Sequence, residues 1–107
     1  MITEELIQTA VHRLVDQFHP FRIILFGSYA RGTASEKSDV DFLVICPVTE
    51  NRISLVRSMD RSLKGLKLPR DIIVLTPDEF ERDRHIPGTI ARPASKEGKI
   101  LYDSNTR

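Results

Sequence analysis

Three aspartates are the residues whose type and spacing best fit catalytic chemistry. Asp39 and Asp41 stand two positions apart at the start of an apolar run, and Asp71 begins a later run. Side chains at i and i+2 of a strand project from the same face, so the first two carboxylates are expected side by side. Adjacent anions repel each other and are costly to bury, and a divalent cation relieves both penalties. The pattern predicts a metal site, most naturally for magnesium.

Asp71 extends this prediction to a third carboxylate. In an open sheet its strand can lie beside the strand that begins at Asp39, and three carboxylates at one sheet edge can serve two metal ions. Asp71 would then help to hold the ion that lowers the pKa of an acceptor hydroxyl, or it would take the hydroxyl proton as a general base. The residues alone leave both roles open.

Gly27 and Ser28 end an earlier apolar run, and ten residues separate Ser28 from Asp39. A glycine lets the backbone approach phosphate oxygens, and a serine hydroxyl with nearby N–H groups at a helix start can donate to them. Arg31, one turn further on, either reaches the same phosphates or forms a surface ion pair. Gly27, Ser28 and Arg31 are therefore the predicted nucleotide-binding residues.

Hydrophobic periodicity predicts the elements that position these residues. Apolar residues recur at helical spacing from Thr3 to Phe18, and Thr3 can cap that helix. The continuous apolar run over 22–26 is typical of a strand that is covered on both faces. A short helical turn over 29–31 and a second strand over 39–45 are expected to follow.

The second half of the chain repeats this alternation. Apolar spacing predicts another amphipathic helix over 51–64, followed by a third strand over 71–75. Thr76 and Glu79 then form the pattern of a capping box, with a proline between them at the first helical position. The sequence predicts a short helix directly after the third strand.

The C-terminal segment carries weaker signals. A last helix before Gly98 is expected to be weakened by Pro93, which lacks a backbone donor and clashes with the preceding turn. Residues 99–102 predict an edge strand. The expected fold class is α/β (α+β), with a small mixed sheet flanked by helices.

Composition excludes several classes of protein. Sixteen Lys and Arg balance fifteen Asp and Glu, so the net charge of +1 gives no strong field toward nucleic acid. The apolar stretches are shorter than the ~20 residues that cross a bilayer, and the N-terminus lacks the pattern of a signal peptide. We expect a single domain over residues 1–107, cytoplasmic, with no membrane partner and no direct binding of nucleic acid.

The remaining metal-binding residue types carry no second site. His12, His19 and His85 have no partner at metal-ligand spacing, so zinc is not indicated. The single Cys46 fits a reducing compartment and is most simply a small apolar filler of a buried strand. The basic segment from Arg52 to Lys67 is read first as a solvated helix face, with a contact surface for a partner or RNA as the alternative.

Taken together, Gly27-Ser28, the ten-residue spacer, Asp39-x-Asp41 and Asp71 resemble the DNA polymerase β-type nucleotidyltransferase superfamily. The chain is most similar to its minimal branch, the MNT domains encoded beside HEPN toxins. The resemblance extends from the first helix to Gly-Lys-Ile-Leu-Tyr at 98–102 and implies a polymerase β-like fold. Pro93 departs from the helix-compatible residue expected there.

The resemblance also implies an activity and a partner. By it, Asp39, Asp41 and Asp71 would be the catalytic and metal-binding triad for two Mg²⁺ ions, with Gly27 as the turn glycine and Ser28 as the phosphate contact. The implied reaction is transfer of AMP from ATP to an acceptor hydroxyl, in the MNT group a tyrosine of the HEPN toxin, which makes the protein an antitoxin and a protein adenylyltransferase.

Two other hypotheses remain open from the sequence. The fold can act as a binding module that neutralises a HEPN RNase by forming a stoichiometric complex, with nucleotide in a structural role. It can also modify a small molecule such as an aminoglycoside, although such enzymes usually add a helical domain to hold the drug. The intact triad favours the adenylyltransferase over the binding module.

Overall fold

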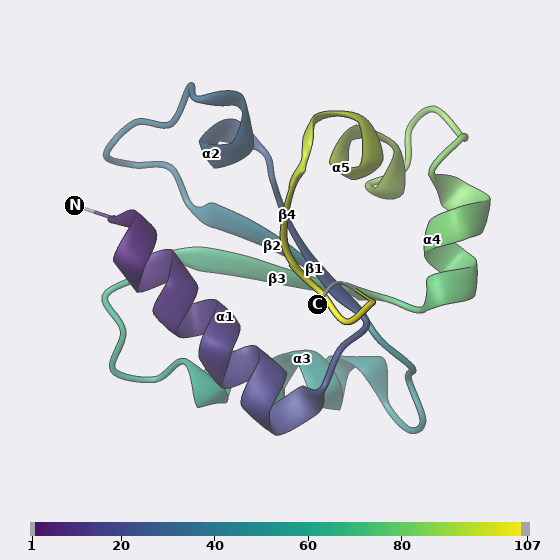
Figure 1. Cartoon of the computed structure of the whole chain (residues 1–107), viewed down its shortest axis with the longest axis horizontal. Helices are drawn as coiled ribbons and strands as arrows, with labels where there is room; N and C mark the ends of the chain where they lie inside the picture. The colour runs from purple at the N-terminus through teal and green to yellow at the C-terminus, as the bar shows by residue number, and fades with distance from the viewer. Residues whose placement is uncertain (1, 106–107) are drawn as a thin grey trace.

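The computed structural model describes residues 2–105 and contains a four-stranded mixed sheet between helices (Figure 1). The strand order is β3-β2-β1-β4, with β2 and β3 parallel and the other two pairings antiparallel. The expected fold class is confirmed. In chain order the elements are α1 Glu4–Phe18, β1 Arg22–Phe26, α2 Ser28–Arg31, β2 Val40–Ile45, α3 Arg52–Ser62, β3 Arg70–Leu75, α4 Pro77–Asp83, α5 Ala91–Glu97 and β4 Lys99–Asp103.

The sheet is covered on both faces, as the continuous apolar run of β1 predicts. Successive side chains of a strand point to opposite faces, so Ile23 and Leu25 of β1 pack toward α1 and α3 while Ile24 packs toward α4 and α5. The β2 residues Phe42 and Leu43 divide in the same way. Figure 1 shows the two helix pairs on either side of the sheet. The central strands are thereby buried on both faces, and their ends can support a site.

Helix α1 begins and ends at recognisable caps. The hydroxyl of Thr3 accepts a hydrogen bond from the N–H of Leu6 at 3.1 Å, as predicted from the sequence. His19 ends the helix in the left-handed conformation, with its N–H on the carbonyl of Val15. α1 has 15 residues, and among residues 2–105 no helix is long and apolar enough to cross a membrane.

The predicted capping box at the start of α4 is present. Thr76 accepts from the N–H of Glu79 at 3.1 Å, and a Glu79 carboxylate oxygen accepts from the N–H of Thr76 at 2.8 Å. The same carboxylate pairs with Arg52 at 2.9 Å, and Arg52 also donates to the carbonyl of Val74 at 3.2 Å. One arginine of α3 therefore ties together the end of edge strand β3 and the start of α4.

The expectation that Pro93 weakens the last helix is wrong. Pro93 is the third residue of α5, which begins at Ala91. The N–H groups of the first helical turn have no partner inside the helix, so a proline there removes no helical hydrogen bond. Gly98 follows, and a Cβ at Gly98 would collide with the carbonyl of Ala94 and the side chain of Ile24. Glycine thus lets the chain turn tightly into β4, the predicted edge strand.

Candidate functional site

Strand pairing brings two of the three predicted aspartates together. Asp41 of β2 is in register with Asp71 of β3, and on its other side it is in register with Phe26, the last residue of β1. Residues in register on neighbouring strands share a face of the sheet, with Cβ atoms roughly 5 Å apart. The prediction that the third strand lies beside the second is confirmed. The two carboxylates therefore stand side by side at one end of the sheet.

Asp39 lies one residue before β2 and is exposed. Its charge nevertheless acts on Asp41, whose pKa is raised above the ordinary value. Burial of the Asp41 carboxyl is the largest cause, followed by the negative charges of Asp71 and Asp39, while the guanidinium of Arg31 acts in the opposite direction. The charges of Asp39 and Asp71 thus both act on the Asp41 carboxyl.

The three carboxylates are neighbours, but they are not already gathered around one point. Among residues 2–105 no three His, Cys, Asp or Glu side chains are arranged as a metal-binding group. The two observations agree, because charges interact over several ångströms whereas Mg²⁺ needs its oxygen ligands at about 2.1 Å. The chemistry of the donor set fits a hard divalent cation, which would relieve the repulsion at Asp41 and accept carboxylate oxygens as ligands.

Gly27 explains how the chain turns next to these acids. Its φ of 75° is in the region that favours glycine, and a Cβ there would collide with Oδ2 of Asp41. The Gly27 carbonyl accepts from the N–H groups of Ala30 and Arg31, both at 3.1 Å, which starts the short helix α2 at Ser28. Ser28 and the first N–H groups of α2 therefore follow directly after the backbone that contacts Asp41.

Arg31 forms the surface ion pair that was one of its two predicted roles, and its contact with phosphates stays a prediction. Its guanidinium opposes the raised pKa of Asp41, so the positive charge lies near the acids. It also forms a long ion pair with Glu97 at 3.9 Å, with both side chains about half exposed. Glu97, the last residue of α5, was missed by sequence reasoning because only the packing of α5 beside α2 brings it to Arg31. Glu97 is thus a neighbour of the site through this exposed ion pair.

The other residue types considered for metal binding are dispersed. His12, His19 and His85 are exposed and lie in α1, directly after α1 and after α4. Cys46 follows β2 and is buried in the core against α1 and α3, as expected for an apolar filler. Burial raises the pKa of its thiol, so the reactive thiolate is disfavoured.

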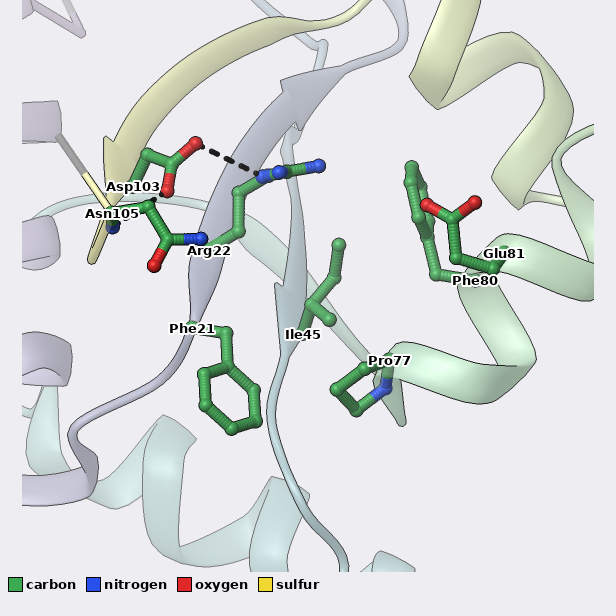
Figure 2. Close-up of a pocket in the computed structure, with 8 residues that line it drawn as sticks. All are labelled: Phe21, Arg22, Ile45, Pro77, Phe80, Glu81, Asp103 and Asn105. Carbon is green, nitrogen blue, oxygen red and sulfur yellow. Dashed lines mark hydrogen bonds and ion pairs between the residues drawn. The ribbon is translucent and has the colours of Figure 1, made fainter.

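A hollow that Figure 2 shows lies at the end of the sheet opposite Asp41 and Asp71. Its volume is about 280 Å³, and Arg22, Ile45 and Phe80 contribute to its lining. Arg22 begins β1 and pairs with Asp103 at 3.4 Å, whereas Asp41 faces the last residue of β1. Asp39 and Asp71 are exposed, so the acidic site at the opposite end of the sheet is open to solvent and accessible to a substrate presented from outside.

One known protein family matches most of this chain. The model of the family described as "Nucleotidyltransferase domain" matches residues 7–100. Two relatives in Methanocaldococcus jannaschii are provisionally assigned as protein adenylyltransferases. MJ0604 is 34% identical over 83 residues, which are 76% of this chain and 77% of that protein. MJ1305 is 54% identical over 44 residues, which are 41% of this chain and only 29% of that longer protein.

Solved structures show the same fold at lower identity. A Sulfolobus solfataricus protein, provisionally assigned as a nucleotidyltransferase, matches with a TM-score of 0.66 at 23% identity, over 94% of this chain and 79% of that one. A mutant of the toxin–antitoxin MntA-HpeT matches with a TM-score of 0.66 at 24% identity, over 98% and 76%. A toxin–antitoxin with AMP-PNP matches with a TM-score of 0.60. The family match over residues 7–100, together with the relative that is 34% identical, shows that this chain is an enzyme of the nucleotidyltransferase family, and the solved structures share its fold.

Proposed function

We propose that the protein is a magnesium-dependent protein adenylyltransferase that transfers AMP from ATP to a hydroxyl of another protein. The observation that carries the proposal is the β2–β3 register, which sets Asp41 beside Asp71 with Asp39 close enough to act on the same carboxyl. Relatives provisionally assigned as protein adenylyltransferases support the choice of reaction. The solved toxin–antitoxin with AMP-PNP supports an adenine nucleotide as substrate.

In this proposal the acceptor oxygen bonds to the α-phosphorus of ATP while the bond from that phosphorus to the bridging oxygen breaks, and pyrophosphate leaves. Asp39 and Asp41 would hold magnesium. Asp71 would either complete the metal site, with the proton of the acceptor hydroxyl passing to water, or take that proton itself. When bound, magnesium would neutralise negative charge on the triphosphate and lower the pKa of the acceptor hydroxyl. Gly27 keeps the backbone close to Asp41, and α2 starts directly after it. In this proposal Ser28 and Arg31 of α2 contact the phosphates.

The acceptor in this proposal is a tyrosine of a HEPN toxin, and the protein is its cytoplasmic antitoxin. The fold is shared with the antitoxin-containing structures, and the open acidic site leaves room for an acceptor that another protein presents.

A non-catalytic antitoxin is the second candidate, because the three carboxylates are not already gathered as a metal-binding group. In that case the fold neutralises the toxin by covering it, and nucleotide has only a structural role. The two candidates make opposite predictions about a covalent product.

The deciding experiment mixes the purified protein with MgCl₂, labelled ATP and the product of the neighbouring toxin gene. Intact-protein mass spectrometry should find a mass increase of AMP on the toxin, lost in the Asp39→Ala/Asp41→Ala double variant. Asp16→Ala, at an exposed position of α1, is the control and should retain the product. Absence of any adduct with wild type, together with full neutralisation by the double variant, would establish the binding module instead.

A further inference from the structure

Positive charge is concentrated in one part of this nearly neutral chain. Residues 51–70, which comprise α3 and the segment leading into β3, carry a net charge of +5, so the rest of the chain carries −4. A charge distribution of this kind creates a local field that steers a charged partner even when the total charge is small. The concentration lies beside the strand that carries Asp71.

Three of these cations form one stripe. Arg57, Arg61 and Lys64 follow the i, i+4, i+7 spacing that places side chains on one face, with Lys64 in the turn just after α3. All three are exposed, and within residues 2–105 none of them forms an ion pair. Arg70, in contrast, is held by Asp60 at 2.9 Å. The stripe therefore retains its charge for an external partner.

The stripe borders a surface groove that reaches Asp71. This hollow, here called the α3 groove, has a volume of about 650 Å³ and runs between α3 and the outer edge of β3. Half-buried Val56 and Ile72 supply apolar surface within it. Its lining residues are Val56, Arg57, Asp60, Arg61, Lys64, Arg70, Asp71 and Ile72. One wall of the groove is thus continuous with the candidate active site.

We propose that the α3 groove docks an acidic segment of the acceptor protein and thereby delivers the acceptor hydroxyl to Asp71. The proposal rests on the proposed function and adds to it the chemistry of the substrate surface. Carboxylates of the acceptor would pair with Arg57, Arg61 and Lys64, while apolar side chains of the same segment would cover Val56 and Ile72. Charge complementarity of this kind sets encounter rate and orientation more than total affinity.

A protein segment fits the groove better than nucleic acid does. Surfaces that bind single-stranded nucleic acid combine cations with aromatic side chains on which bases stack, and nucleic-acid-binding domains typically have a pI above ~9. None of the residues that line the α3 groove is aromatic. The sequence pI is 7.9. Apolar surface between the cations instead suits the side chains of a polypeptide.

The test compares two variants that each remove two positive charges. Arg57→Gln/Arg61→Gln changes the α3 groove, and the control Arg82→Gln/Lys99→Gln changes exposed positions on α4 and β4. The assay is AMP transfer to the toxin partner at saturating ATP. The groove variant should raise the KM for the acceptor roughly tenfold, and this KM should depend less on salt concentration than it does in wild type. The KM for ATP should stay within about twofold, and the control should behave as wild type.

Further measurements separate the outcomes. A poly-glutamate peptide should inhibit competitively against the acceptor and not against ATP. An unchanged KM for the acceptor in the groove variant overturns the proposal. If that variant, unlike wild type and the control, also loses micromolar binding of a uridine oligonucleotide, the groove binds nucleic acid instead. If wild type forms no adduct, the proposed function fails. The affinity of the protein for the same partner, measured by calorimetry, then tests the groove separately. A roughly tenfold loss of affinity in the groove variant supports docking, and an unchanged affinity overturns it.

Discussion

The two ends of the sheet shift the pKa of an acidic side chain in opposite directions. At the end where β1 passes into α2, Asp41 stands among other acids, and its pKa is raised by burial and by the charges of Asp71 and Asp39. At the end where β3 passes into α4, Glu79 is bonded to Arg52 and to the N–H of Thr76, and these bonds lower its pKa to about 2.

The difference distinguishes an acid that stabilises the fold from one that is a candidate for binding a ligand. An acid that stabilises the fold has its charge satisfied by the protein itself, as Glu79 has. Asp41 has its charge opposed by its neighbours, and only Arg31 acts in its favour. Perturbed pKa values concentrate at functional sites for this reason, because the missing compensation is left for a ligand. The predictions below test whether the two ends differ in function as they do in electrostatics.

The largest expected effect is on catalysis. Asp41→Asn keeps the size of the side chain and removes its negative charge, so AMP transfer should fall at least ~100-fold, the scale seen when one preorganised electrostatic contact to a transition state is lost. Glu79→Gln should leave the rate within about twofold under conditions where both variants are folded. Initial rates of labelled AMP incorporation measure both. Equal losses in the two variants would mean that the two ends are not functionally distinct.

The next effect is on stability at the acidic end. Gly27→Ala should lower the free energy of unfolding by about 2–3 kcal/mol, because the new Cβ meets Asp41 and φ is 75°. Gly65→Ala is the matched control: its φ is 92°, but nothing lies within 4 Å of its Cβ, so about 1 kcal/mol is expected. Urea unfolding followed by circular dichroism gives both values. Similar losses would show that the contact with Asp41 is unimportant.

A smaller effect is expected at the opposite end. Glu79→Gln should cost about 1–2 kcal/mol at pH 7, because it weakens the capping box and the bond to Arg52. The pKa of Glu79 is lowered from 4.5 to about 2, so its contribution is complete above pH 4.5 and disappears as the pH falls toward 2. Unfolding curves of wild type and variant should converge over that range. A difference that persists at pH 2 would show that the ionised carboxylate is not responsible.

The smallest effect has the opposite sign. The raised pKa of Asp41 means that its ionised form destabilises the fold at pH values above 3.8, so Asp41→Asn should gain about 0.5 kcal/mol at pH 7, a gain that vanishes in acid. Saturating MgATP should reverse the order, since ligand binding to the native state stabilises wild type. Thermal unfolding with and without MgATP measures this. If Asp41→Asn destabilised the protein without ligand, the ionised Asp41 carboxylate would not be a source of instability at this end of the sheet.

Local signals made most of the fold predictable from sequence. The predicted strand over 22–26 coincides with β1, and the capping pattern after the third strand starts α4 where expected. Such features depend on neighbouring residues and on apolar period, so the chain displays them directly. Pro93 was misjudged because its effect depends on where α5 begins, and helix starts without a side-chain cap leave little trace in sequence.

The site was predictable in its residues and less so in its arrangement. The spacing of the three aspartates identified acids of which the β2–β3 register sets Asp41 beside Asp71, while the charge of Asp39 acts on Asp41. Their separation, and the pairing of Arg31 with Glu97, depend on how distant segments pack. Long-range geometry of that kind has no local pattern, so it required the structure. Catalytic roles for these residues remain predictions.

Arg52 has a consequence for how the protein behaves among copies of itself. The carbonyls of Pro69 and Leu75 face β2, so by alternation that of Val74 points outward from edge strand β3, where Arg52 occupies it. An outer strand with unpaired backbone groups invites strands from other molecules, and a charged side chain on it is a common natural defence. Arg52, which reaches β3 from α3, occupies one outward-facing carbonyl of this edge and so leaves that acceptor unable to pair with a strand of another molecule.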